Sequence, residues 1–114
     1  MLPAAHRLRD PAGFRSATRA GRRSSSRTLV THYVAGAGPL EVGFVVSKQV
    51  GGAVVRNRVK RRLRYAVRDL LVRDAVPASG RLVVRALPAS ATASYEELAA
   101  DLTRCLDRVH APVA

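Results

Sequence analysis

Residues 54–74, VVRNRVKRRLRYAVRDLLVRD, carry the clearest pattern in the chain and decide how the rest is interpreted. Apolar residues recur every three or four positions, which is the repeat of a helix with one buried face. The apolar stripe consists of Val55, Val59, Leu63, Ala66, Val67, Leu70 and Leu71. The pattern predicts an amphipathic helix that packs one face against the rest of the fold.

The remaining surface of this helix is basic. Between residues 56 and 68 there are seven Lys and Arg and no Asp or Glu. On a helical wheel the stripe is opposed by Arg58, Lys60, Arg61, Arg64 and Arg68, and flanked by Arg56 and Arg62. Like charges four apart destabilise a helix by roughly a few tenths of a kcal/mol per pair, and an ordinary solvated face mixes both signs. The pattern therefore favours binding to an external polyanion. A polyanion with phosphates would fit, because guanidinium groups bind phosphate oxygens in bidentate fashion.

Asn57 interrupts the basic run near the expected start of the helix. A cap or turn residue is one interpretation, because Asn accepts hydrogen bonds from free backbone amides. A polar contact to a sugar, a base edge or a hydrated metal is the other. The sequence leaves both open.

The whole chain shares this charge imbalance. Its 114 residues carry 20 Lys and Arg against 8 Asp and Glu, a formal net charge of +12. Nucleic acid, an anionic membrane and an acidic protein are candidate partners, and nucleic acid is favoured at this charge. No stretch approaches the roughly 20 apolar residues of a membrane span. The length fits one domain, expected to cover residues 1–114.

Outward from the long helix, turn residues divide the chain into further elements. Residues 28–35 and 41–47 are rich in β-branched and aromatic types and are separated by a Gly-Pro turn, so they are expected to pair as a hairpin. Residues 22–27 are interpreted as a polar loop, and residues 11–20 as a short helix capped by Asp10.

After Pro77 and Gly80, residues 82–87 predict another strand. Ser94 and Glu97 have the spacing of a capping box, and the helix that they begin places Leu98, Leu102, Cys105, Leu106 and Val109 on one face. Cys105 is the single cysteine, so it is expected to be a buried packing residue. The expected order is α-β-β-α-β-α, with room for one more short strand.

No catalytic constellation is present in the sequence. His6, His32 and His110 have no metal-ligand spacing with one another or with Cys105, and Glu96 and Glu97 are explained by the start of a helix. We therefore expect no catalytic residues and no metal ligands on this chain. Any part in catalysis would be played by binding.

The run GFVVSKQVGGAVVRNRVKRRLR, residues 43–64, resembles the signature of the bacterial ribonuclease P protein component. Arg7-Leu8-Arg9 followed by Phe14 resembles the family's opening, and Pro88-Ala89 followed by Tyr95-Glu96-Glu97 its closing helix. The sequence departs from the family at Thr18 and His32, where aromatic residues are common, at Gly52 in place of Asn, and in the order Arg85-Ala86. These departures leave the basic helix intact and reduce the aromatic surface.

The resemblance implies a fold and a function. The fold would be α+β, a single-domain α/β sandwich with a four-stranded sheet and a left-handed crossover (ribosomal protein S5 domain 2-like), an exception to the usual right-handed rule. The function would be that of a cytoplasmic subunit of ribonuclease P, an endoribonuclease that removes the 5′ leader of precursor tRNA. A separate RNA subunit would perform hydrolysis with bound magnesium.

The resemblance also assigns roles to residues. The set implied to bind RNA is Ser47, Lys48, Arg56, Asn57, Arg58, Lys60, Arg61, Arg62, Arg64 and Arg68. Phe14, Val30 and His32 would line a cleft for the single-stranded leader, whose bases can stack on rings. The implied partners are the catalytic RNA and precursor tRNA, with no membrane and no DNA.

Two other classes remain as alternatives. A non-enzymatic RNA-binding protein, such as a ribosomal component, would explain the charge but not the 43–64 run. A DNA-binding regulator would need a second helix packed closely before residues 54–74, and the sequence predicts none.

Overall fold

The computed structural model describes residues 21–110, so the helix predicted for residues 11–20, with Phe14, lies outside the described residues. The elements are, in chain order, β1 (Arg22–Ser25), β2 (Leu29–Pro39), β3 (Glu41–Val45), α2 (Ala53–Val72), β4 (Ser79–Ala86), the short 3-10 helix η2 (Pro88–Ala91) and α3 (Tyr95–His110). The predicted long helix is α2, and the predictions of a strand near 82–87 and of a helix after Ser94 are confirmed by β4 and α3.

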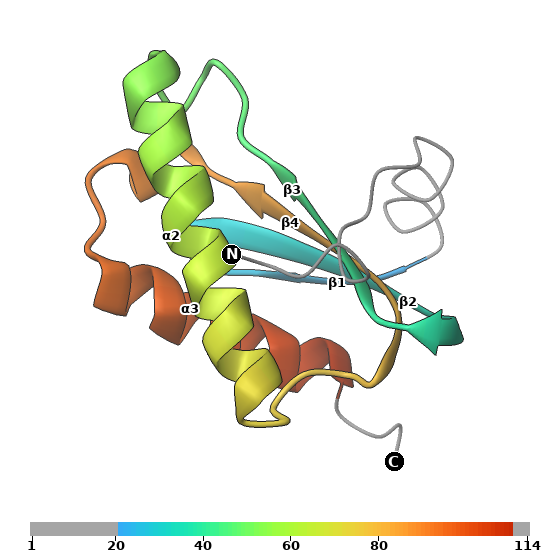
Figure 1. Cartoon of the computed structure of the whole chain (residues 1–114). Coiled ribbons are helices and arrows are strands. Elements are labelled where there is room, and N and C mark those ends of the chain that lie inside the picture. The colour runs from blue at the N-terminus through green and yellow to red at the C-terminus, as the bar shows by residue number, and fades with distance from the viewer. Residues whose placement is uncertain (1–20, 111–114) are drawn as a thin grey trace.

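The four strands form one mixed sheet in the order β1-β2-β4-β3. β1 with β2 and β2 with β4 are antiparallel, whereas β3 and β4 are parallel. Both helices lie on one face of the sheet, and α2 connects the parallel strands β3 and β4 (Figure 1). With the helices towards the viewer and the parallel strands pointing up, β4 lies to the left of β3, so the connection through α2 is left-handed (Figure 1). The expected α+β architecture with a four-stranded sheet is confirmed.

The predicted hairpin of residues 28–47 is wrong. β2 and β3 follow each other in sequence, but β4 lies between them and pairs with both. The physical reason is burial on both sheet faces. Leu82, Val83 and Val84 of β4 are all fully buried, and a strand that is apolar on both faces gains most from a central position.

The interpretation of residues 22–27 as a loop is also wrong for their first part. Residues 22–25 form β1, which pairs with residues 30–33 of β2 at the edge of the sheet. An edge strand is held by backbone hydrogen bonds on one side only, so it can be short and polar. Composition therefore gave no sign of a strand here.

The core lies between the sheet and the two helices. α2 contributes Val59, Leu63, Ala66, Val67 and Leu70, with Val55 and Leu71 partly buried, which confirms the apolar stripe. α3 contributes Leu98, Leu102, Cys105, Leu106 and Val109, which confirms the second face and the packing role of Cys105. The predicted capping box is formed, since the Glu97 amide donates to Ser94 Oγ and the Ser94 amide to Glu97 Oε1, both at 3.1 Å.

Candidate nucleic-acid interface

α2 begins directly after the turn that follows β3. Gly52 is the N-cap residue, and its carbonyl accepts the first hydrogen bond of the helix from the Arg56 amide. Asn57 therefore lies inside the helix with its side chain exposed, which rules out the cap interpretation and leaves the polar-contact interpretation as a prediction. The first turn contains no acidic residue, so the positive end of the helix dipole adds to the charge of the basic side chains.

The predicted RNA-binding residues occupy one continuous region but differ in exposure. Ser47 and Lys48 are exposed in the turn before α2. Within α2, the side chains of Asn57, Arg58, Arg61 and Arg68 are exposed, whereas those of Arg56, Lys60, Arg62 and Arg64 are half-buried. The placement of Lys60 and Arg64 opposite the apolar stripe is therefore wrong. They lie along the side of the helix, because each directly follows a stripe residue, Val59 or Leu63, and one residue turns the helix by only about 100°.

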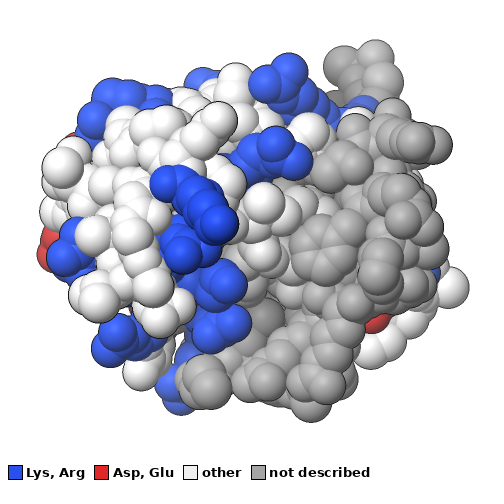
Figure 2. Space-filling view, turned by 90° about the horizontal axis from the view of Figure 1, so that it is seen from above, with Lys and Arg blue, Asp and Glu red and all other residues white. Residues whose placement is uncertain are grey.

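None of the basic side chains of α2 is paired with an acid of the described part of the chain. The ion pairs within residues 21–110 are Arg27–Glu97, Arg81–Glu41 and Arg104–Asp101, and all lie elsewhere. Figure 2, which looks onto the end of the molecule where α2 begins, shows Lys and Arg side chains in a band, with acidic side chains only near the margins of the view. The positive charge of α2 is thus left without internal compensation from the described acids.

Two of these arginines also hold the fold together. Arg58 Nη2 donates to the carbonyl oxygen of Ala91 at 2.9 Å, and Arg62 Nη1 donates to that of Ala93 at 3.0 Å. These bonds fasten α2 to η2 and the segment before α3. Arg61 and Arg68 make no hydrogen bond or ion pair to the residues that the structure describes. They are therefore the side chains most available to an external anion.

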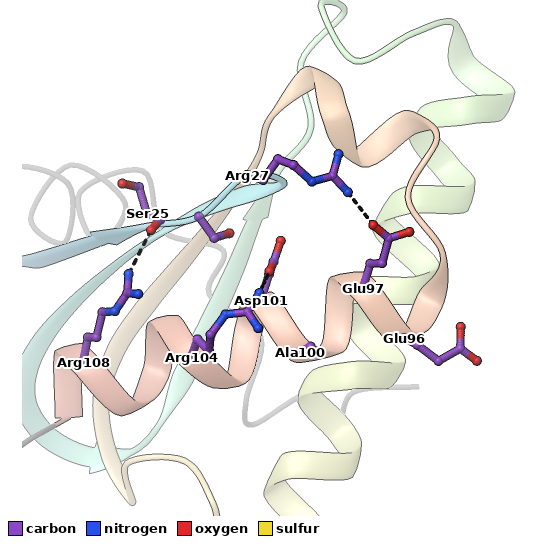
Figure 3. A pocket seen from close by; sticks show the side chains of 9 residues that line it. Ser25, Arg27, Glu96, Glu97, Ala100, Asp101, Arg104 and Arg108 are labelled. Atoms are coloured by element: carbon purple, nitrogen blue, oxygen red, sulfur yellow. Dashed lines mark hydrogen bonds and ion pairs between the residues drawn. The ribbon is translucent and has the colours of Figure 1, made fainter.

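A groove beside α3 contains arginines that, unlike those of α2, have acidic partners among the described residues. It has a volume of about 620 Å³ and lies between α3 and the β1–β2 turn. Figure 3 shows Arg27 directed at Glu97 and Arg108 at the backbone of Ser25, and Arg104 pairs with Asp101. The three arginines of this groove are thus bound by other groups of the described chain, two of them by carboxylates.

Asp101 is the buried anchor of that groove. Its Oδ2 accepts a hydrogen bond from Thr28 Oγ1. Burial alone would raise the pKa of the Asp101 carboxyl, but the hydrogen bond from Thr28 and the charge of Arg104 hold the pKa below its usual value. The carboxylate is therefore structural, tying the β1–β2 turn to α3.

The sheet face opposite the helices carries the two described residues predicted for the leader cleft. Val30 and His32 alternate with Leu29, Thr31 and Tyr33 along β2, so they point away from the helical face. Val30 is buried and His32 is half-buried. Phe14, the third predicted residue, lies outside the described residues.

Two arginines that the sequence interpretation did not assign flank His32 on this face. Arg23 of β1 is its cross-strand partner, and Arg85 of β4 lies opposite Val30. Burial lowers the pKa of His32 below its ordinary value of 6.5, and the charges of Arg23 and Arg85 lower it further. The alternation of Arg81, Val83 and Arg85 with the core residues of β4 is the signal that could have identified Arg85.

We expect His32 to titrate below pH 6.5 in the free protein and at a higher pH with single-stranded RNA bound. Phosphates would offset Arg23 and Arg85 and so restore proton affinity. Since the folded state holds this proton less tightly than the unfolded chain, the stability contributed by His32 falls as the pH drops below about 6.5. NMR titration of the imidazole, assigned with a His32→Gln variant, measures both midpoints. A midpoint at or above 6.5 without RNA would contradict the expectation.

No three His, Cys, Asp or Glu side chains of residues 21–110 lie together in a way that could hold a metal ion. Within the same range, neither α2 nor any other helix has the length and apolar character needed to cross a membrane.

The family model described as Ribonuclease P matches residues 2–110. A ribonuclease P protein component from Nocardioides sp. is 56% identical, covering 99% of this chain and 98% of the relative. One from Acidothermus cellulolyticus is 48% identical, covering 96% and 92%.

Solved structures agree on the fold. The ribonuclease P protein of Staphylococcus aureus has a TM-score of 0.79 at 23% identity, covering 91% of this chain and 94% of that one. The ribonuclease P protein of Thermotoga maritima has a TM-score of 0.79 at 21% identity, covering 90% and 96%. The likeness at these low identities is one of architecture.

Proposed function

The chain belongs to the bacterial ribonuclease P protein family, and from that membership we propose that it binds the catalytic RNA of the enzyme through α2 and the 5′ leader of precursor tRNA on the sheet face opposite the helices. It is a protein subunit of an endoribonuclease that processes tRNA. A ribosomal component is not favoured, because the family match spans residues 2–110.

The observation that carries the proposal is the uncompensated charge of α2. A helix with seven basic residues between positions 56 and 68, and no ion pair to a described acid, is stabilised when phosphates replace the missing carboxylates. The RNA-contacting set would be Ser47, Lys48, Arg56, Asn57, Arg58, Lys60, Arg61, Arg62, Arg64 and Arg68. Because Arg58 and Arg62 also bind backbone carbonyls, they would position η2 as well as meet RNA.

The leader would lie across Val30 and His32, with Phe14 contributing from the N-terminal segment. Arg23 and Arg85, beside His32, supply positive charge for the phosphates of a single strand. A neutral His32 can stack on a base without adding a charge of its own. With His32 in place of the family's common aromatic residue, we propose that leader binding here depends more on charge than on stacking.

Hydrolysis would be carried by the RNA subunit, with magnesium bound through that RNA supplying metal-activated water. This chain would contribute no catalytic residue and would help the RNA hold substrate and metal by neutralising phosphate repulsion. We propose that residues 1–114 work as one RNA-binding domain in the cytoplasm, with no membrane or DNA partner.

Reconstitution tests the proposal. Adding the chain to the catalytic RNA at a magnesium concentration too low for the RNA alone should strongly accelerate cleavage of precursor tRNA at the mature 5′ end. A precursor with a leader of several nucleotides should gain more than one whose leader is a single nucleotide, because only the longer strand reaches the sheet. Absence of stimulation with either substrate would overturn the proposed function.

A further inference from the structure

The outermost line of α2 contains an exposed aromatic residue, which the basic charge of the helix does not explain. Residues three or four apart lie in a row on a helix, and this row is formed by Val54, Arg58, Arg61, Tyr65, Arg68 and Val72. All six side chains are exposed. Tyr65, at the middle of the row with arginines before and after it, leaves 46% of its surface accessible to solvent.

Tyr65 differs from the other two tyrosines of the chain in having no structural role in the described fold. Tyr33 packs against the core and donates its hydroxyl to the Ser79 carbonyl at 2.8 Å. Tyr95 packs against the core and donates to Asp69 Oδ2 at 3.0 Å. Tyr65 belongs to neither apolar cluster, and its hydroxyl bonds to no residue within 21–110.

We propose that Tyr65 stacks on an unpaired nucleobase of the catalytic RNA while Arg61 and Arg68 bind the phosphates on either side. This inference rests on the proposed docking of α2 on RNA and adds what that surface recognises. A ring presents a flat apolar surface that any base can cover, and such stacking is a main source of affinity for unpaired nucleotides. The surface would therefore prefer a bulged or looped nucleotide over a continuous duplex, whose bases are already stacked on one another.

The spacing of the row supports this arrangement. At a rise of about 1.5 Å per residue, Arg61 and Arg68 are separated by roughly 10 Å along the helix axis, with Tyr65 between them. Neither arginine is engaged by a described residue, so both guanidinium groups can turn towards a strand that crosses the ring. Phosphate contacts and a stacked base can then be made by the same short stretch of RNA.

Affinity measurements with the catalytic RNA separate stacking from charge. Tyr65→Ala should weaken binding roughly ten-fold without changing the slope of log affinity against log salt, because no charge is lost. Tyr65→Phe should bind like the original chain, since it retains the ring. Val72→Ala, which trims an exposed apolar side chain from the same row, is the matched control and should change affinity less than two-fold.

Fluorescence gives a second readout that does not depend on affinity. The chain contains no tryptophan, so Tyr65→Trp introduces a unique probe at the proposed stacking position. Binding of the catalytic RNA should quench its emission strongly, whereas tryptophan at the control position, Val72→Trp, should be quenched much less. Equal quenching at the two positions would overturn the stacking assignment.

An Arg61→Ala variant, measured in parallel, distinguishes the proposed docking of α2 on RNA from the proposed stacking of Tyr65. If Arg61→Ala lowers affinity and salt slope while Tyr65→Ala and Tyr65→Trp show no effect, the docking surface stands and stacking is refuted. If Arg61→Ala also has no effect, α2 does not face the RNA, and the proposed function fails with it.

Discussion

Replacing Gly80 with alanine is expected to lower the free energy of unfolding by about 3 kcal/mol or more. Gly80 has a φ of +104°, a conformation that side chains rarely adopt. A Cβ at this position would lie 2.5 Å from the carbonyl oxygen of Val34 and 2.9 Å from the ring of Tyr33. Val34 cannot easily retreat, because it is paired with Arg81 of β4 in the sheet.

The position matters because Gly80 lies where the pairing of β2 with β4 changes register, between Val34 and Pro39. β4 is one of the two internal strands and also carries Arg85, so strain here would disturb the core and the sheet face together. Gly36→Ala is the matched control. Its new Cβ would meet only the Gly80 Cα, at an ordinary 3.7 Å, so a change below about 1 kcal/mol is expected. Equal unfolding midpoints of the two variants in denaturant would contradict this account of Gly80 at the register change.

The helices could be predicted from sequence because their evidence is local. The repeat of Val59, Leu63, Ala66 and Leu70 fixes which face of α2 is buried. The same wheel predicts the exposed Arg58, Arg61 and Arg68, although it misplaced Lys60 and Arg64. Ser94 and Glu97 mark the start of α3 within four residues. Each of these signals is carried by neighbouring residues along one helix.

The sheet could not be predicted in the same way, because its pairing joins residues far apart in sequence. The Gly-Pro turn favoured a hairpin, yet the double-sided burial of β4 placed that strand between β2 and β3. β1 is held by backbone pairing and not by apolar side chains, so its composition resembled a loop. The order of strands follows from total burial, which no local motif contains.

The candidate site was likewise predictable from sequence only where its evidence is local. The basic residues of α2 were predictable, but the engagement of Arg58 and Arg62 by the carbonyls of Ala91 and Ala93 was not, since these contacts span about thirty residues. The approach of Arg23 and Arg85 to His32 likewise depends on strand order. Only the fold separates arginines with structural partners from those left available to RNA.

A double variant, Arg61→Ala with Arg68→Ala, is expected to bind the catalytic RNA at least about 100-fold more weakly at moderate salt. Each hydrogen-bonded contact between a guanidinium and a phosphate contributes roughly 1.5–3 kcal/mol, and two would be lost. Stability should be nearly unchanged, because both side chains are exposed and neither bonds to a described residue. Equilibrium binding with labelled RNA, after a check of the thermal unfolding midpoint, measures the loss.

The matched control removes two charges from elsewhere on the protein. Arg27→Ala with Arg108→Ala lowers the net charge by the same two units, from +12 to +10, but acts in the groove beside α3. Glu97, the ion-pair partner of Arg27, is exposed, so little of the free energy of unfolding depends on that pair. A loss of affinity below about five-fold is expected, reflecting only the weaker long-range field.

The salt dependence of binding by these two double variants tests most directly whether phosphates compensate the charge of α2. The slope of log affinity against log salt should fall by nearly two for Arg61→Ala with Arg68→Ala, one step for each lost phosphate contact, and should stay close to the original value for Arg27→Ala with Arg108→Ala. Equal slopes for both variants would mean that the arginines of α2 sense the RNA only at a distance, and the helix would then not be the docking surface.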